Sequence, residues 1–184
     1  MADPTIDLPV TGDGVVIDRL TQADAEALSR SHSDPDNARY QGWPTPLSVE
    51  DAAAFIDEMA AEPVAQPDSG VQLAVREQAG GSLAGDLYVA RTADEPEAVE
   101  VGITLVPRFH GRGLAIRAIT TISEALLELD GVERVLASID NENTASQALF
   151  QRVGFRLIST EVGSFTRRDG SVGDELVFAL VRSG

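Results

Sequence analysis

The residues that most constrain the fold are 99–139, where a helical pattern separates two runs typical of β-strands. The first run, 99–106, is largely apolar and is followed by Pro107. Apolar side chains recur at helical spacing through 113–129, and a second strand-like run follows at 132–139. A helix between two such strands favours a crossover connection that makes the strands parallel. We therefore expect a mixed sheet that contains at least one parallel pair.

Patterns on either side extend this unit into one α/β domain. Strand-like runs lie at 15–20, 71–76, 83–90, 155–165 and 176–181, and helical patterns lie at 23–30, from Ser48 onward and at 145–153. The pair Gly80–Gly81 between two of these runs predicts a hairpin. We expect a single domain over 14–184, preceded by a flexible lead-in at 1–13 that is rich in Pro, Gly and Asp.

The side chains that are absent exclude several kinds of chemistry. All 14 basic residues are arginine, so P-loops, protein kinases and Schiff-base enzymes, which need a lysine, are excluded. Without cysteine, the sequence has no thiol nucleophile, disulfide or thiolate metal site. His32 and His110 are the two histidines, too few for a multi-histidine centre, so we expect no metal.

The charge balance limits the partners. A net charge of −16 at pH 7 argues against nucleic acid and anionic membranes, because both are held by basic surfaces. An acidic surface instead attracts cations such as amines. Residues 1–11 lack the basic and apolar regions of a signal peptide, and no apolar run approaches about 18 residues, so a cytoplasmic location is expected. The sequence leaves a homodimer open.

One segment of this acidic chain carries only positive charge. Between Val101 and Ser123 there is no acidic residue, while Arg108, Arg112 and Arg117 lie in or beside a glycine-bearing turn between a strand and a helix. The first N–H groups of a helix and its dipole favour an anion, and glycines allow the backbone to approach a pyrophosphate. The Rossmann pattern lacks its third glycine here, and the P-loop lacks its lysine. A tight turn without a ligand is the alternative interpretation.

The order of elements and three motifs resemble the GNAT superfamily of N-acetyltransferases. The motifs are HGRGLA at 110–115, NTAS at 143–146 and GF at 154–155. The resemblance covers about residues 14–182 and is strongest to the ribosomal-protein N-terminal acetyltransferases, the RimJ/RimL-like branch. It implies an α/β (α+β) fold with a twisted, mixed and mostly antiparallel sheet of about 6–7 strands flanked by about 4 helices. It also implies acetyl-CoA as the cofactor.

By this resemblance, the turn wraps the pyrophosphate of coenzyme A and the strand before it pairs with the pantetheine arm. The residues implied as cofactor-binding are Ile103, Thr104, Leu105, Arg108, His110, Gly111, Arg112, Gly113, Leu114, Ala115, Ile116, Asn143, Ser146 and Phe150. His110 stands where the family usually has Gln or Arg. Phe150 stands where many relatives have a tyrosine that protonates the leaving thiolate, so Ser146 or water would have to do so here. Helix capping is the alternative role for Asn143, and core packing for Phe150.

Glu100 is the candidate base that removes the proton from the attacking amine. By alternation it shares a strand face with Gly102 and Thr104, and Gly102 leaves room for a ligand beside it. A glutamate at this place also matches relatives, although a route through water and a purely surface role stay open. Ser138, where some relatives have their base, is a poor substitute. Backbone N–H groups at the end of this strand are the expected oxyanion donors.

The acceptor is expected to bind beside residues 39–43, part of the irregular segment 39–46, where the family builds its variable substrate wall. Tyr40, Trp43 and, more weakly, Tyr88 are the candidate contacts. The predicted reaction transfers an acetyl group to a primary amine by direct attack in a ternary complex. These residues do not separate a protein N-terminus from a small cationic amine. A non-catalytic acyl-CoA-binding or regulatory module, and transfer of another acyl group, are the alternatives.

Overall fold

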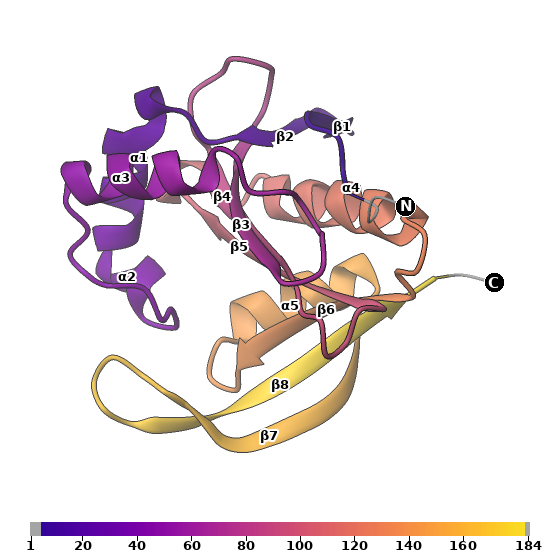
Figure 1. Cartoon of the computed structure of the whole chain (residues 1–184). Helices are drawn as coiled ribbons and strands as arrows, with labels where there is room; N and C mark the ends of the chain where they lie inside the picture. The colour runs from indigo at the N-terminus through magenta and orange to yellow at the C-terminus, as the bar shows by residue number, and fades with distance from the viewer. Residues whose placement is uncertain (1–4, 183–184) are drawn as a thin grey trace.

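The computed structural model describes residues 5–182, which form one eight-stranded sheet with helices on both faces (Figure 1). The strands are β1 (Val10–Gly12), β2 (Val15–Arg19), β3 (Ser69–Arg76), β4 (Gly85–Arg91), β5 (Ala98–Leu105), β6 (Arg134–Asp140), β7 (Arg156–Thr166) and β8 (Val172–Val181). The helices are α1 (Ala25–Ser33), α2 (Pro35–Ala38), α3 (Val49–Met59), α4 (Leu114–Glu128) and α5 (Thr144–Val153), with short 3-10 helices at Gln22–Asp24 and Pro107–Phe109.

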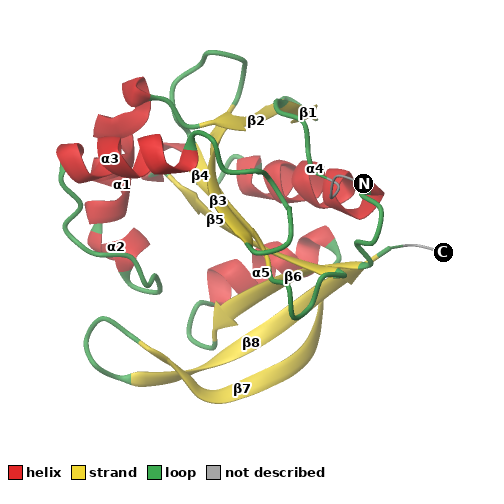
Figure 2. Cartoon of the chain, in the orientation of Figure 1, coloured by secondary structure: helices red, strands yellow, loops and turns green. Residues whose placement is uncertain are grey.

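The strand order is β1-β2-β3-β4-β5-β6-β8-β7, and among the described strands only β5 and β6 pair in parallel. This confirms the expected mixed, mostly antiparallel sheet. It also confirms that the two strands of 99–139 pair in parallel and that the strands on either side of Gly80–Gly81 form a hairpin. Helix α4 is the crossover between the two parallel strands. Figure 2 shows α1 and α3 together near one end of the sheet and the β7–β8 hairpin at the other.

Two short elements, β1 and α2, were not expected from the sequence. Strand β1 lies inside the expected lead-in 1–13, of which residues 1–4 are outside the described part of the chain. Helix α2 begins at Pro35 and is capped by the Asp34 side chain, which accepts hydrogen bonds from the N–H groups of Asp36 and Asn37. Elements of three or four residues are too short to show a hydrophobic period, which is why the sequence pattern did not reveal them.

The two faces of the central strands differ in burial. On β3, Val71, Leu73 and Val75 are fully buried and pack in the main core, together with Ile119 and Ile122 of α4. Truncating such an isoleucine to alanine costs about 2–5 kcal/mol. The opposite face of the same strands is only partly covered, and this uncovered part becomes the site described below.

Helices α1 and α3 cover the part of this second face nearest to β2. Ala74 of β3 packs there with Leu28 of α1 and Ile56 of α3. Helix α3 begins as expected, with the Ser48 hydroxyl accepting a hydrogen bond from the Asp51 N–H at 3.0 Å. Within residues 5–182, no helix is both long enough and apolar enough to cross a bilayer.

Candidate active site

Strands β5 and β6 are paired only at their beginning. The pairing joins Ala98–Glu100 to Arg134–Leu136, after which β5 continues to Leu105 and β6 to Asp140 without further pairs between them. The two strands therefore diverge, and backbone groups of β5 that point towards β6 are left for a ligand to pair with. Nothing in the sequence shows where two parallel strands separate.

The turn after β5 presents free N–H groups. Gly111 and Gly113 have φ values of +70° and +71°, a left-handed conformation that glycine adopts readily. The first hydrogen bond of helix α4 runs from the Arg117 N–H to the Gly113 carbonyl, at 3.2 Å. Within residues 5–182, no protein acceptor binds the N–H groups of 111–116, which lie at the positive end of the α4 dipole. Such a cradle fits a pyrophosphate.

The arginines around this turn are partly engaged by the protein. A guanidinium nitrogen of Arg112 lies 2.8 Å from a carboxylate oxygen of Glu77. Arg117 donates to the carbonyl of Arg112 at 3.0 Å, and the guanidinium carbon of Arg108 lies 4.9 Å from the ring centre of Phe109. Glu77 therefore partly neutralises the charge of Arg112, and the backbone N–H groups of 111–116 remain available to an anion.

The other side chains of the turn serve the fold. His110 Nε2 lies 3.0 Å from the carbonyl oxygen of Leu105 and so ties the turn to the end of β5. The side chain of Leu114 is buried in the core. Ala115 and Ile116 are half-buried in the first turn of α4. For these residues, any contact with a phosphate would come mainly from the backbone.

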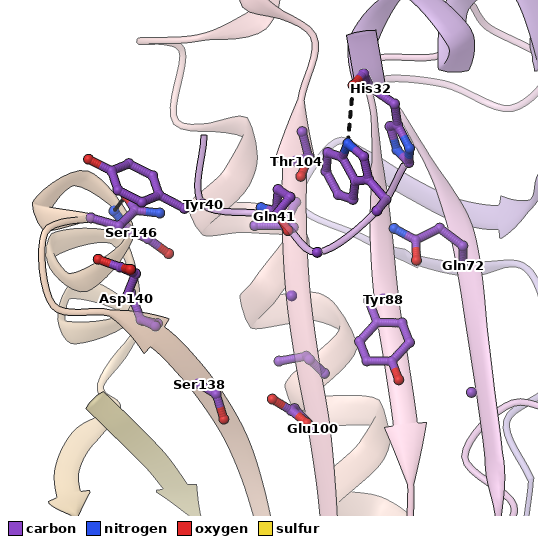
Figure 3. A pocket seen from close by; sticks show the side chains of 18 of the residues that line it. His32, Tyr40, Gln41, Gln72, Tyr88, Glu100, Thr104, Ser138, Asp140 and Ser146 are labelled. Atoms are coloured by element: carbon purple, nitrogen blue, oxygen red, sulfur yellow. Dashed lines mark hydrogen bonds between the residues drawn. The ribbon is translucent and has the colours of Figure 1, made fainter. Parts of the chain in front are cut away.

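A cavity of about 760 Å³ lies on the open face of the central strands and reaches the gap between β5 and β6. Figure 3 shows side chains from several elements around it. It brings together the predicted residues Tyr40, Trp43, Tyr88, Glu100, Ile103, Thr104, Asn143, Ser146 and Phe150. Leu105 and residues 108–116 do not line it. No group of three or more acidic or histidine side chains within residues 5–182 is arranged to hold a metal ion.

Glu100 and Tyr88 lie on the sheet face that forms the cavity (Figure 3). The alternation expected on β5 is confirmed, because Glu100 is half-buried on the cavity side while Val99 and Val101 are buried in the core. Burial, and secondly the negative charge of Glu100, raise the pKa of Tyr88 above its usual 10.0. The phenol therefore stays protonated near neutral pH and can donate a hydrogen bond.

Helix α5 contributes three predicted residues from its first two turns. The Asn143 side-chain oxygen accepts a hydrogen bond from the Ser146 N–H at 3.2 Å, so the capping role is confirmed, and both residues also line the cavity. Phe150 is 2% exposed and meets Phe155 edge-on, with ring centres 5.0 Å apart. Core packing is thus its main contact, although its ring reaches the cavity wall.

The segment 39–47 forms one wall of the cavity and is held from two sides. The ring of Trp43 stacks on His32, with centres 3.9 Å apart and planes at 10°. The carbonyl of His32 accepts hydrogen bonds from Trp43 Nε1 and Thr45 Oγ1, both at 3.1 Å. From the β7–β8 turn, Arg168 donates to the Trp43 carbonyl at 2.6 Å. The indole is thereby fixed in place as part of the wall.

A buried ion pair at the base of the β7–β8 turn escaped sequence analysis. Arg167 is 8% exposed and contacts both carboxylate oxygens of Asp140, at 2.8 and 3.0 Å. It also lies 3.2 Å from Glu142, whose backbone carbonyl accepts a hydrogen bond from the Tyr40 hydroxyl at 3.4 Å. The hairpin is thus joined to the loop before α5 and to the acceptor wall. Pairing across so many residues has no local sequence signal.

A second polar group that the sequence pattern did not reveal lies under the cavity. Asp86 of β4 is fully buried and contacts His32 of α1 and Gln72 of β3. The one signal was an aspartate at the start of an otherwise apolar strand. Because buried carboxylates require partners, that aspartate could have indicated a polar neighbour, although not which one.

Comparisons with known proteins agree on one family. The family described as "Acetyltransferase (GNAT) domain" matches residues 15–156. An uncharacterised N-acetyltransferase of Bacillus subtilis, YoaA, is 24% identical over 170 residues, covering 92% of this chain and 94% of that protein. A solved GNAT-family acetyltransferase from Bacillus anthracis has a TM-score of 0.80 at 19% identity, covering 95% of this chain and 98% of that one.

The solved structures of similar fold include a RimJ protein, a member of the branch that the sequence resembles. RimJ of Mycobacterium smegmatis, in complex with CoA-disulfide, has a TM-score of 0.74 at 19% identity, covering 91% of this chain and 81% of that one. With the family match extending over most of the sequence and the fold matching over nearly its whole length, the chain belongs to the GNAT family of N-acetyltransferases, whose acetyl donor is acetyl-CoA.

Proposed function

We propose that the acceptor is a primary amine that binds in the cavity beside Tyr88 and segment 39–47, with Glu100 as the base. The position of Glu100 is the observation that carries the proposal. This carboxylate lines the cavity next to Gly102, in the last pair before β5 and β6 separate. It therefore borders both the acceptor cavity and the gap that fits the pantetheine arm.

The cofactor would be bound at two places, the turn before α4 and the edge of β5. The N–H groups of 111–116 bind the pyrophosphate, and the edge of Ile103–Leu105 that faces β6 pairs with the pantetheine arm, apart from the Leu105 carbonyl, which already contacts His110. Asn143, Ser146 and Phe150 face the arm from α5, on the other side of the gap. When bound in this way, acetyl-CoA supplies an acetyl group as a reactive thioester.

The transfer forms a C–N bond, breaks the C–S bond, removes one proton from the amine and gives one to the thiolate. Glu100 accepts the proton of the amine, directly or through water. The N–H groups at the end of β5 stabilise negative charge on the carbonyl oxygen. The Ser146 hydroxyl, or a water molecule, donates to the thiolate, because Phe150 has no proton to give.

The charge of the cavity favours a cationic acceptor over a neutral one. Its wall includes the carboxylates of Glu100, Asp140 and Glu175, and within residues 5–182 no arginine lines it. Asp140 is paired with Arg167, which leaves Glu100 and Glu175 as the negative charges that a cation can approach. A small cationic amine is the acceptor that these groups fit best.

Replacing Glu100 by glutamine tests the proposal. We expect kcat with a cationic amine to fall by about 10²–10⁴-fold, because glutamine keeps the shape but cannot accept the proton. Affinity for acetyl-CoA, measured by calorimetry, should not change. Glu175→Gln is the matched control, since it removes the other free carboxylate of the wall and should affect mainly KM. An unchanged kcat for Glu100→Gln would reject Glu100 as the base.

A further inference from the structure

Three polar side chains form a connected group in which His32 and Gln72 line the cavity and the buried Asp86 lies between them. Asp86 is fully buried, and one of its carboxylate oxygens lies 3.2 Å from His32 Nε2. The other carboxylate oxygen accepts a hydrogen bond from the side-chain amide nitrogen of Gln72. Gln72 itself lines the cavity (Figure 3), and its contact with the buried Asp86 fixes the orientation of its side chain.

This arrangement determines which atom of the Gln72 amide faces the ligand. A carboxylate accepts hydrogen bonds and donates none, so the nitrogen of Gln72 must face Asp86 and the oxygen must point away. His32 occupies the first oxygen of Asp86, which prevents the carboxylate from turning. None of the hydrogen bonds formed by residues 5–182 reaches the amide oxygen of Gln72. The cavity therefore presents a fixed hydrogen-bond acceptor.

Gln72 and the proposed base lie on one sheet face, at opposite ends of Tyr88. Strand pairing aligns Gln72 with Tyr88 and Gly102, and aligns Glu100 with Ala90 in the next row. Two strand spacings of about 4.8 Å and one step of two residues put the backbones of Gln72 and Glu100 about 12 Å apart. Figure 3 shows the Tyr88 ring between these two side chains, and its hydroxyl is directed towards Gly70, where an added β-carbon would lie 3.3 Å from it.

We propose that Gln72 determines specificity by accepting a hydrogen bond from the distal end of the acceptor. The acceptor is then an amine with a second N–H donor, of which an α,ω-diamine is the simplest. Its reacting nitrogen lies at Glu100, its carbon chain crosses Tyr88, and its distal ammonium donates to Gln72. His32 and Asp86 are positioning residues that hold the Gln72 amide. This inference rests on the proposed function, because Glu100 marks the reacting end.

Matched amines test the inference at saturating acetyl-CoA. Putrescine and cadaverine are each compared with the monoamine of equal length, pentylamine and hexylamine. For the unmodified chain we expect KM to be about tenfold lower for the diamine, because its distal ammonium makes a hydrogen bond that the monoamine lacks. In Gln72→Met the ratio should fall to about one. Gln78→Met, which changes an exposed glutamine outside the cavity, should keep the ratio.

Asp86→Asn distinguishes positioning from a structural role. If His32 still donates to the side-chain oxygen at this position, the new amide nitrogen replaces the second oxygen and donates to Gln72. The Gln72 amide then reverses and presents its nitrogen to the cavity. The diamine should lose its advantage, and 3-methoxypropylamine, which carries an acceptor at the distal end, should gain one. A purely structural role for Asp86 would weaken all the amines in parallel.

The outcomes separate the two proposals. Equal KM values for diamine and monoamine in the unmodified chain, or an unchanged ratio in Gln72→Met, would overturn the role of Gln72 and leave amine acetylation standing. Turnover of no amine in the series, by a chain that is stabilised by acetyl-CoA, would overturn the proposed acceptor class together with the inference. In a chain that does turn over amines, stabilisation of the CoA-bound form by putrescine but not by pentylamine, measured as a Tm shift, would support the role of Gln72 by a binding measurement.

Discussion

The two halves of the proposed site are built in different ways. The proposed cofactor half comes mainly from one continuous stretch, from β5 through the turn to the start of α4, with α5 on its other side, and the turn offers mostly backbone N–H groups. The acceptor half is assembled by side-chain contacts from β3, β4, segment 39–47 and the β7–β8 hairpin. Backbone recognition tolerates changes of side chain, such as His110 in place of the usual Gln or Arg. Side-chain recognition does not, so specificity can change while the cofactor site stays the same.

The largest effect is expected from Gly113→Glu, which tests recognition of the cofactor by the backbone. A carboxylate and a β-carbon at a φ of +71° would strain the turn and repel the pyrophosphate, so coenzyme A binding should be lost. At about 100 times its dissociation constant, acetyl-CoA stabilises the unmodified chain by about 2.7 kcal/mol, and the variant should show no such shift in Tm. Gly170→Glu is the control, because it adds the same charge at a φ of +84° in the β7–β8 turn. Retained binding in Gly113→Glu would refute the phosphate site.

Arg167→Met tests the half that depends on side chains. It leaves Asp140 buried without its cation and releases the hairpin that holds segment 39–47. We expect kcat/KM for the amine to fall by about 10- to 100-fold through misplacement of the wall, with the Kd of acetyl-CoA nearly constant. Arg156→Met, an exposed change on the same hairpin, should have no effect on either. An equal loss for both substrates would show that the two halves are not independent.

The pH dependence of stability tests the ion pair between Asp24 and Arg76, which lies outside both halves of the site. Burial by itself would raise the pKa of Asp24, but hydrogen bonds from Arg76 and Thr21 outweigh it and hold the pKa below 3.8. A depressed carboxyl pKa contributes stability above the unfolded value, and this contribution is lost as the pH falls below about 4. Urea unfolding between pH 6 and pH 3 should show this decline, and Asp24→Asn should show less of it. A wild-type curve as flat as that of the variant would contradict the assignment.

The smallest effect is expected from Arg112→Ala. Because its guanidinium is exposed and already paired with Glu77, its removal should raise the Kd of coenzyme A only about two- to fivefold. Titration calorimetry at two salt concentrations measures this change. Arg30→Ala, which breaks an exposed pair on α1, is the control. A loss as large as that of Gly113→Glu would mean that charge, and not backbone, dominates the cofactor half.

The cofactor half could be predicted from the sequence much better than the acceptor half. The cofactor half was visible because its residues are neighbours in the chain, and a strand, two glycines and an acid-free helix start occur within 99–117. The alternation of Glu100 with Val99 and Val101 was visible for the same reason. Local patterns report local structure, and for the sheet as a whole they were sufficient to predict the fold class.

The acceptor half could not be predicted because its contacts join distant residues. His32 meets Asp86, and Arg167 meets Asp140, across intervals that no periodic pattern covers. The separation of β5 from β6 after Glu100 is likewise a property of three-dimensional packing. Tyr40 and Trp43 were expected in the wall from the resemblance, not from any property of the segment itself.

The exclusive use of arginine has a chemical consequence for an enzyme that handles an acylating reagent. Thioesters acylate lysine ε-amines, and acetylation removes the charge of a lysine. Here the ion pairs that join the hairpin, the β2–β3 region and the turn are made by guanidinium groups, which are not targets of this reaction. The scaffold thus offers its own reagent no side-chain amine to consume, and slow self-modification during turnover would not erode the charges that hold it together.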